Sequence, residues 1–156
     1  MGYTTIFDGR LKLSKKLTDN ELLDYHNNWL EPRHTIHDDE YTTGRKDAPG
    51  IWLKWNIYEE EGDHYLEWTG AEKFYRYYEW LELIVEKFLE PKQIYLQGRI
   101  TYSGEETVDA GLITAHTQTT QQKSGDEEEW RDVSTTVLNI YNAFEHMAEH
   151  LNQYKH

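Results

Sequence analysis

The chain contains no cysteine, 3 prolines and 2 methionines in 156 residues. The absence of cysteine excludes disulfide bonds, thiol catalysis, and zinc or iron–sulfur sites held by thiolates. Basic residues are also scarce, since 16 Lys and Arg stand against 29 Asp and Glu, which gives a net charge of -13. This imbalance argues against direct nucleic-acid binding and against attraction to an anionic membrane surface.

Long apolar runs are absent as well. No stretch approaches the roughly 18 consecutive apolar residues that a membrane-spanning helix needs. The segment from Met1 to Ile6 has neither a basic region nor an apolar core, so no secretory signal is expected. We therefore expect a cytoplasmic protein without a membrane role, and no sequence motif indicates a cofactor.

Large aromatic side chains are what the sequence has in quantity. Hydrophobic residues make up only 37% of the chain, but aromatic residues make up 14%, with 6 Trp and 12 Tyr. A disordered chain would lack these rings. The length supports one domain spanning residues 1–156, with a core built from rings more than from aliphatic side chains.

Alternating and helical spacings of apolar residues divide the chain into eight elements. Helical spacing predicts two helices that begin at the Thr-x-x-Glu capping boxes of Thr18 and Thr69, and a third that begins at about Val133. Pro32 and Pro91 end the first two helices. The polar stretch 31–50 is predicted to be a long loop. Period-two alternation predicts strands at 3–13, 51–57, 66–68, 94–102 and 112–119.

The resulting order, β-α-β-β-α-β-β-α, predicts an α+β fold. Because the strands have one polar face, we expect an antiparallel sheet of about five strands with the helices on one face. The first six elements match the ferredoxin-like order. A curved meander that wraps the second helix is the competing arrangement.

A set of strand and turn residues gives a resemblance to known sequences. They are Gly2-Tyr3, Phe7-Asp8-Gly9, Leu11, Leu13, Leu17-Thr18, Glu72-Lys73-Phe74-Tyr75, Trp80-Leu81, Gly98, Ile100, Tyr102, Gly104-Glu105, Asp109 and Gly111. With these residues the chain resembles a group of small bacterial and phage proteins that have no established activity. The resemblance implies a mobile-element setting and no particular chemistry. It does not cover the 31–50 loop or the C-terminal segment.

Two histidine clusters are candidate metal sites. His146 and His150 lie four residues apart with Glu149 between them, which is the inverted zincin spacing. A third ligand would have to come from upstream, for example from His116. The alternative is that both histidines flank the apolar stripe of a solvated helix. The cluster of residues 34–40 matches no ligand motif, so a solvated loop is the main interpretation there.

The second predicted helix carries an acidic stripe. Glu79, Glu82, Glu86 and Glu90 are spaced by three or four residues, so they share one helix face. Residues 59–90 hold ten acids against three basic residues. A solvated surface and a docking surface for a basic protein are both consistent with this stripe. Five aromatic residues fall off the main apolar faces and are candidates either for a binding groove or for the core: Trp52, Tyr58, Tyr65, Tyr75 and Trp80.

Three functional hypotheses follow. The leading one is a non-catalytic module that presents the acidic stripe, with Trp80 and Tyr75, to a basic surface of another protein. Its most concrete form is an inhibitor of a nucleic-acid-handling host protein. The alternative is a binder of a small anionic, nucleotide-like ligand, in which the long loop closes over an aromatic pocket on the sheet. The basic residues of the loop would contact the ligand: Arg33, Arg45 and Lys46.

A metal-dependent hydrolase that uses His146, Glu149 and His150 is the third hypothesis. No Gly-x-Ser-x-Gly elbow, P-loop or dinucleotide-binding motif is present in the sequence. Common hydrolase, NTPase and dehydrogenase chemistries therefore have no support from sequence motifs.

Overall fold

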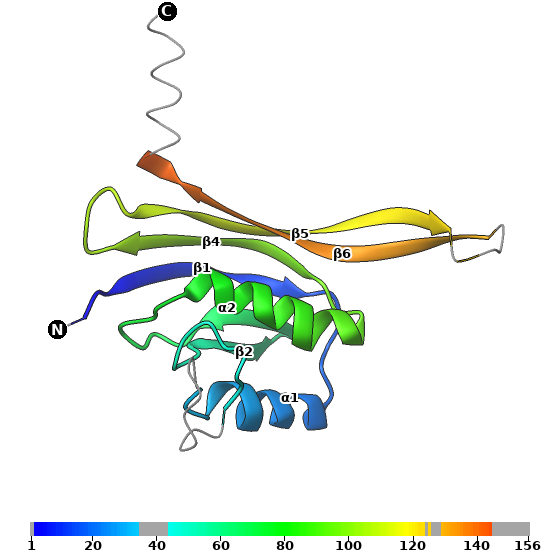
Figure 1. Ribbon diagram of the computed structural model, residues 1–156, viewed down its shortest axis with the longest axis horizontal. Helices are drawn as coiled ribbons and strands as arrows, with labels where there is room; N and C mark the ends of the chain where they lie inside the picture. Colours follow the sequence, from blue (N-terminus) through cyan, green and yellow to red (C-terminus); the bar gives the residue numbers. More distant parts are fainter. Residues whose placement is uncertain (1, 35–43, 124, 126–128, 145–156) are drawn as a thin grey trace, which may run out of the picture.

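A computed structural model describes residues 2–34, 44–123, 125 and 129–144 of the chain. Within them, six strands form one antiparallel sheet in the order β2-β3-β1-β4-β5-β6 (Figure 1). The strands are β1 (Thr5–Leu13), β2 (Trp55–Glu60), β3 (Asp63–Trp68), β4 (Leu96–Gly104), β5 (Ala110–Lys123) and β6 (Trp130–Asn142).

Two helices accompany the sheet. The first, α1 (Asp19–Tyr25), continues as a short π-helical segment, η1 (His26–Leu30). The second, α2 (Tyr77–Leu83), continues through η2 (Ile84–Leu89) and ends in the 3-10 turn η3 (Glu90–Lys92). The fold is therefore α+β, and the β-α-β-β-α-β order expected for the first six elements is present.

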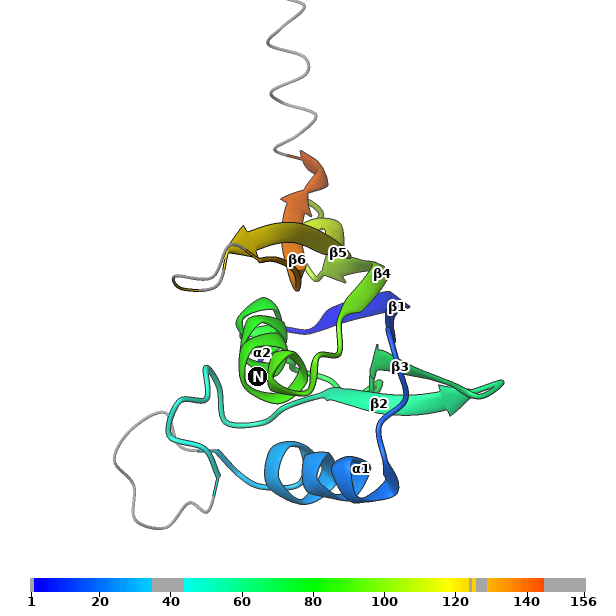
Figure 2. The same cartoon turned by 90° about the vertical axis from the view of Figure 1, so that its right-hand side faces the viewer.

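The sheet curves around α2, and α1 lies beyond it on the β2 side (Figure 2). In β1, Phe7, Leu11 and Leu13 are buried, whereas Asp8 and Lys12 between them are exposed. Tyr25 of α1 contacts both the second helix and the sheet. The Tyr25 ring lies 5.1 Å from the ring of Phe88, and its hydroxyl donates to the Trp55 carbonyl at 2.5 Å.

Rings form the centre of the core, as the composition predicted. Phe7 contacts four aromatic side chains edge-on, at centroid distances from 4.9 Å (Trp55) to 6.0 Å (Phe74). The buried apolar residues of the sheet and both helices form one cluster. Edge-to-face ring pairs add about 0.5–1.5 kcal/mol each beyond their buried area.

Two glycines allow β1 and β4 to approach closely at the centre of the sheet. Gly9 has φ of 108° and Gly98 has φ of 145°. A Cβ on Gly9 would lie 2.5 Å from the Arg99 carbonyl oxygen, and one on Gly98 would lie 2.6 Å from that of Arg10. Glycine at such positions permits the bend of a curved sheet.

Three of the strand and turn residues named in the sequence analysis, Tyr3, Glu105 and Asp109, take part in hydrogen bonds between the N-terminal segment and the β4–β5 turn. The Tyr3 hydroxyl donates to Asp109 Oδ2 at 2.7 Å and accepts from the Glu106 N–H at 3.1 Å. The Thr4 N–H donates to Glu105 Oε1 at 2.7 Å. These contacts give the motif a structural role.

The sequence-based expectation of a helix from Val133 is wrong over residues 133–142. These residues belong to β6, which pairs with β5 from Gly111↔Asn142 to Lys123↔Trp130. The sheet therefore has six strands where about five were expected. β-branched residues explain the error, because Val133, Thr135, Thr136 and Val137 favour strands. Residues 145–151 of the expected helix lie outside the described part of the chain.

The second capping box was also predicted wrongly. The α2 helix begins at Tyr77, and its N-cap residue Arg76 has left-handed backbone angles and no side-chain cap. Thr69 instead accepts a hydrogen bond from the Ala71 N–H at 3.3 Å, within a turn. The first capping box, between Thr18 and Glu21, is confirmed.

Candidate functional site

The curved sheet brings its last strand, β6, over α2 (Figure 2). A groove of about 240 Å³ lies between them and is bounded by side chains from both elements. The helix contributes Tyr78, Glu82, Val85 and Glu86, and β6 contributes Thr136 and Leu138.

Two residues of the acidic stripe, Glu82 and Glu86, lie in the helix wall of this groove. Trp80, Leu81 and Ile84 of the helix are buried, so the intervening acids are turned outward. Glu79, Glu82 and Glu86 are exposed, and Glu90 is half-buried.

Nearby cations neutralise this wall only in part. Arg76 lies 3.7 Å from Glu79, and Lys87 lies 3.7 Å from Glu86. Exposed pairs of this kind contribute about 0–1 kcal/mol. No cation pairs with Glu82 among the described residues. The carboxylates of Glu82 and Glu86 therefore make the groove electrostatically negative.

Tyr78 lies beside these acids. Burial raises the pKa of its phenol, and the charges of Glu82 and Glu79 raise that pKa further. The hydroxyl therefore stays protonated at neutral pH. It presents a neutral donor and an apolar ring face to the groove.

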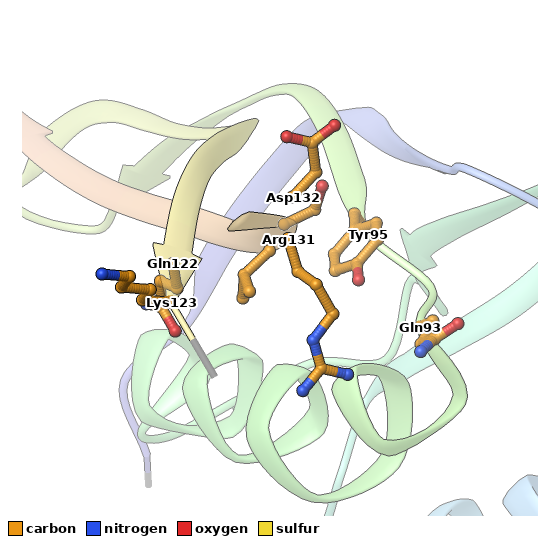
Figure 3. A pocket seen from close by; sticks show the side chains of 8 residues that line it. Gln93, Tyr95, Gln122, Lys123, Arg131 and Asp132 are labelled. Carbon is orange, nitrogen blue, oxygen red and sulfur yellow. The ribbon is translucent and has the colours of Figure 1, made fainter. Parts of the chain in front are cut away.

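A second depression of about 300 Å³ lies farther along β6. Figure 3 shows Arg131 extending from β6 toward the helix, with Tyr95 and Gln93 on one side and Gln122 and Lys123 on the other. Two cations, Lys123 and Arg131, line this depression with one acid, Asp132, whereas the groove beside Glu82 and Glu86 is lined by acids and no cation.

The structure separates residues that the sequence analysis grouped together. Trp80 is 0% exposed, so it belongs to the core and is unavailable to a partner, which corrects its assignment to the binding surface. Tyr75 is 52% exposed, but it precedes α2 and lines a different cleft, together with Trp52.

Among the basic residues of the long loop, Arg45 is held by contacts within the protein. The Arg45 guanidinium lies over the Trp29 ring at 4.3 Å and bonds Asp47 at 2.8 and 2.9 Å. This pairing lowers the pKa of Asp47. Arg33 and Lys46 are exposed. Residues 35–43 lie outside the described part of the chain, so the expected closure of this loop stays a prediction.

His34, the first residue of the predicted loop cluster, is buried. Its Nε2 lies 2.6 Å from the Trp29 carbonyl oxygen, and its Nδ1 accepts from the Arg45 N–H at 2.9 Å. This arrangement requires a neutral ring with the proton on Nε2, and burial lowers its pKa accordingly. The geometry gives His34 a structural role.

The zincin-like residues His146, Glu149 and His150 lie outside the described part of the chain. Within residues 2–34, 44–123, 125 and 129–144, no three His, Asp or Glu side chains are grouped so that they could hold a metal. In those same ranges no helix is long and apolar enough to cross a membrane.

The aromatic cleft beside Trp52 and Tyr75 could be predicted from the sequence only in part. It has a volume of about 450 Å³, and its lining includes Trp52, Tyr75, Lys54, Lys73 and Arg76. The rings were recognised as candidates, but the three cations were not connected with them. The signal was local basic charge beside those rings in an otherwise acidic chain.

Comparison of the chain with protein-family models, curated proteins and solved structures found no match.

Proposed function

We propose that the protein is a non-catalytic binding module that holds a basic segment of another protein in the groove between α2 and β6. The single observation that carries this proposal is the placement of Glu82 and Glu86 in a depression shared with Thr136 and Leu138. Carboxylates in a concave surface attract a positively charged partner more strongly than the same charges on a convex one.

The surroundings of the acids favour an extended or helical peptide over a small ion. The ring of Tyr78 and the side chains of Val85 and Leu138 offer apolar contact beside the charges. Such a mixture suits the aliphatic stems and charged heads of Lys and Arg. The net charge of -13 supports long-range attraction of a basic protein.

The resemblance to bacterial and phage proteins supports a more specific version of the proposal. A basic partner in that setting is a host protein that handles nucleic acid, and the module would inhibit it by occupying its basic surface. Such a role places the protein in the cytoplasm. Glu79 and Glu90 extend the same acidic helix face beyond the groove. They would contact the partner at the rim of the interface.

Charge reversal tests the proposal. The probe is a labelled arginine-rich peptide whose binding to the full chain is followed by fluorescence anisotropy. We expect Glu82→Lys combined with Glu86→Lys to weaken binding by about tenfold or more, because two attractive contacts become repulsive. The affinity of the unaltered protein should fall as salt rises from about 50 to 200 mM.

A matched control separates the groove from overall charge. Glu61 and Glu106 are exposed acids in the β2–β3 and β4–β5 connections. Changing both to Lys alters the net charge by the same amount as the groove variant. Binding that falls equally in both variants, or in neither, contradicts the proposal.

A further inference from the structure

The cleft beside Trp52 and Tyr75 has the size of a small-molecule site. Its volume is about 450 Å³, and ligand pockets typically enclose about 300–1,000 Å³. The segment 49–52 forms one part of its lining and the segment 72–76 another. Trp52 is 48% exposed and Tyr75 is 52% exposed, so both rings present large apolar surfaces to a ligand.

The two segments are held in place by bonds that leave the rings accessible. The Tyr75 hydroxyl accepts from the Tyr3 N–H at 3.0 Å, which fixes the orientation of its ring. Lys54 Nζ donates to the backbone carbonyls of Glu72 and Lys73. Burial lowers the pKa of Lys54, and the charge of Lys73 lowers it further.

The charge of the cleft is opposite to that of the whole protein. Three cations line it against a single acid, Glu72, although the chain as a whole carries -13. Lys73 makes no ion pair among the described residues, and Arg76 has only the exposed Glu79 at 3.7 Å. Both residues have positive φ, 62° and 57°, which costs a non-glycine residue about 1 kcal/mol or more.

A buried donor lies behind the lining of the cleft. The indole Nε1 of Trp80 is buried and has no hydrogen-bond partner among the described residues. A Cβ on Gly50, which lines the cleft, would lie 3.2 Å from this nitrogen. Such a donor is uncommon in native structures and commonly marks a functional site or an unseen partner.

We propose that this cleft binds a small molecule in which a planar aromatic ring carries a phosphate group, with the ring against Trp52 and Tyr75 and the phosphate between Lys73 and Arg76. Aromatic side chains bind flat rings through their faces. Guanidinium and ammonium groups form charge-assisted hydrogen bonds to phosphate. The proposal goes beyond the groove function, because the site uses different residues and the opposite charge.

Calorimetric titration of the full chain with four probes tests the two halves of the ligand. The probes are adenosine 5′-monophosphate, phenyl phosphate, adenosine and inorganic phosphate. We expect at least one ring phosphate to bind at least tenfold more tightly than both adenosine and inorganic phosphate. Adenosine 5′-monophosphate alone points to a nucleotide, and both ring phosphates point to aryl phosphates in general; either result supports the proposal.

Matched variants place the binding in the cleft. Trp52→Ala should weaken binding of the tighter ring phosphate about tenfold, whereas Trp130→Ala, which removes an exposed Trp on β6, should leave it unchanged. Lys73→Gln with Arg76→Gln should also weaken it about tenfold. Lys15→Gln with Lys16→Gln removes the same charge from two exposed residues of the β1–α1 connection and should have no effect.

Three results would overturn the inference. They are no binding of either ring phosphate at millimolar concentration, equal affinity for adenosine or inorganic phosphate, and equal losses in the cleft and control variants. The Glu82→Lys/Glu86→Lys protein should bind the ring phosphate at least as well as the unaltered protein. The outcome for the cleft is therefore independent of the outcome for the groove.

Discussion

At the scale of single residues, His34 shows how burial decides the role of a titratable group. It follows Arg33 in a polar stretch, and its sequence neighbours suggest a solvated loop or a metal ligand. In the structure it is 1% exposed, and both ring nitrogens are used by the backbone. The sequence gives no sign of this, because the partners, Trp29 and Arg45, lie outside any motif.

The environment of His34 predicts a pH-dependent stability. Its folded-state pKa lies below the unfolded value, because burial opposes the charged form. The unfolded chain therefore binds more protons near neutral pH, and the free energy of unfolding falls as the pH decreases below about 6.5. We expect chemical denaturation to show lower stability at pH 6 than at pH 8, and His34→Gln to reduce that difference.

The comparison controls for other groups that titrate or carry charge near this site. Arg45 and Asp47 face the imidazole from the same loop, and the second buried histidine, His64, is present in both proteins. An identical pH dependence in the unaltered protein and in His34→Gln would contradict the assignment.

Trp80 shows that helical spacing alone does not predict which side chains are buried. Trp80 falls off the main apolar face of the predicted helix, which made it a candidate for a binding surface as well as for the core. The T-shaped contact with His34, 5.0 Å between ring centroids, encloses it instead. A contact with a distant loop residue is invisible to a helical wheel.

At the scale of elements, apolar spacing identified most of the sheet and failed at β6. The first four strands and both helices follow from alternation, helical spacing and one correct capping box. Residues 130–142 contain apolar positions that fit either period, and β-branched content was the better guide. These residues pair with β5 along their whole length, and this tertiary interaction decides the secondary structure where local apolar spacing is ambiguous.

The central bend of the sheet predicts an unequal response to glycine replacement. Gly98→Ala would place a methyl group 2.6 Å from the Arg10 carbonyl oxygen, at a φ of 145°. We expect it to lower the free energy of unfolding by about 3 kcal/mol, from backbone strain and overpacking together. Gly70→Ala is the control, because its φ is 88° and no atom lies within 4 Å of the added carbon.

The control should cost about 1 kcal/mol, the strain of a left-handed backbone alone. Urea denaturation followed by tryptophan fluorescence measures both values, since Trp55 and Trp80 report the core. Equal losses in the two variants would show that close approach at Gly98 is unimportant for stability.

At the scale of the whole molecule, the curved sheet creates two different surfaces along one helix. The segment that leads into α2 carries Lys73, Tyr75 and Arg76 in the aromatic cleft, whereas the body of the helix turns Glu82 and Glu86 toward β6. Opposite charges thus occupy neighbouring sites. Neither surface follows from composition, because each depends on how the sheet and the loops enclose the helix.

The same architecture leaves β6 as an edge strand whose only neighbour among the described residues is β5. An open edge of 13 residues is a template for pairing with another chain, and like charge opposes that pairing. The protein has a pI near 5.0, so the repulsion vanishes at that pH. We expect sedimentation velocity to show monomers at about pH 8 and association at about pH 5.

A charge placed on the edge should suppress this association. Ile140 on β6 is 39% exposed, and Ile6 on the interior strand β1 is 60% exposed. Changing either residue to Lys alters the net charge equally, but only Ile140→Lys introduces a charge beside the open edge. We therefore expect Ile140→Lys to stay monomeric near pH 5 while Ile6→Lys associates like the unaltered protein. Equal behaviour of the two variants would show that overall charge, and not the β6 edge, controls association.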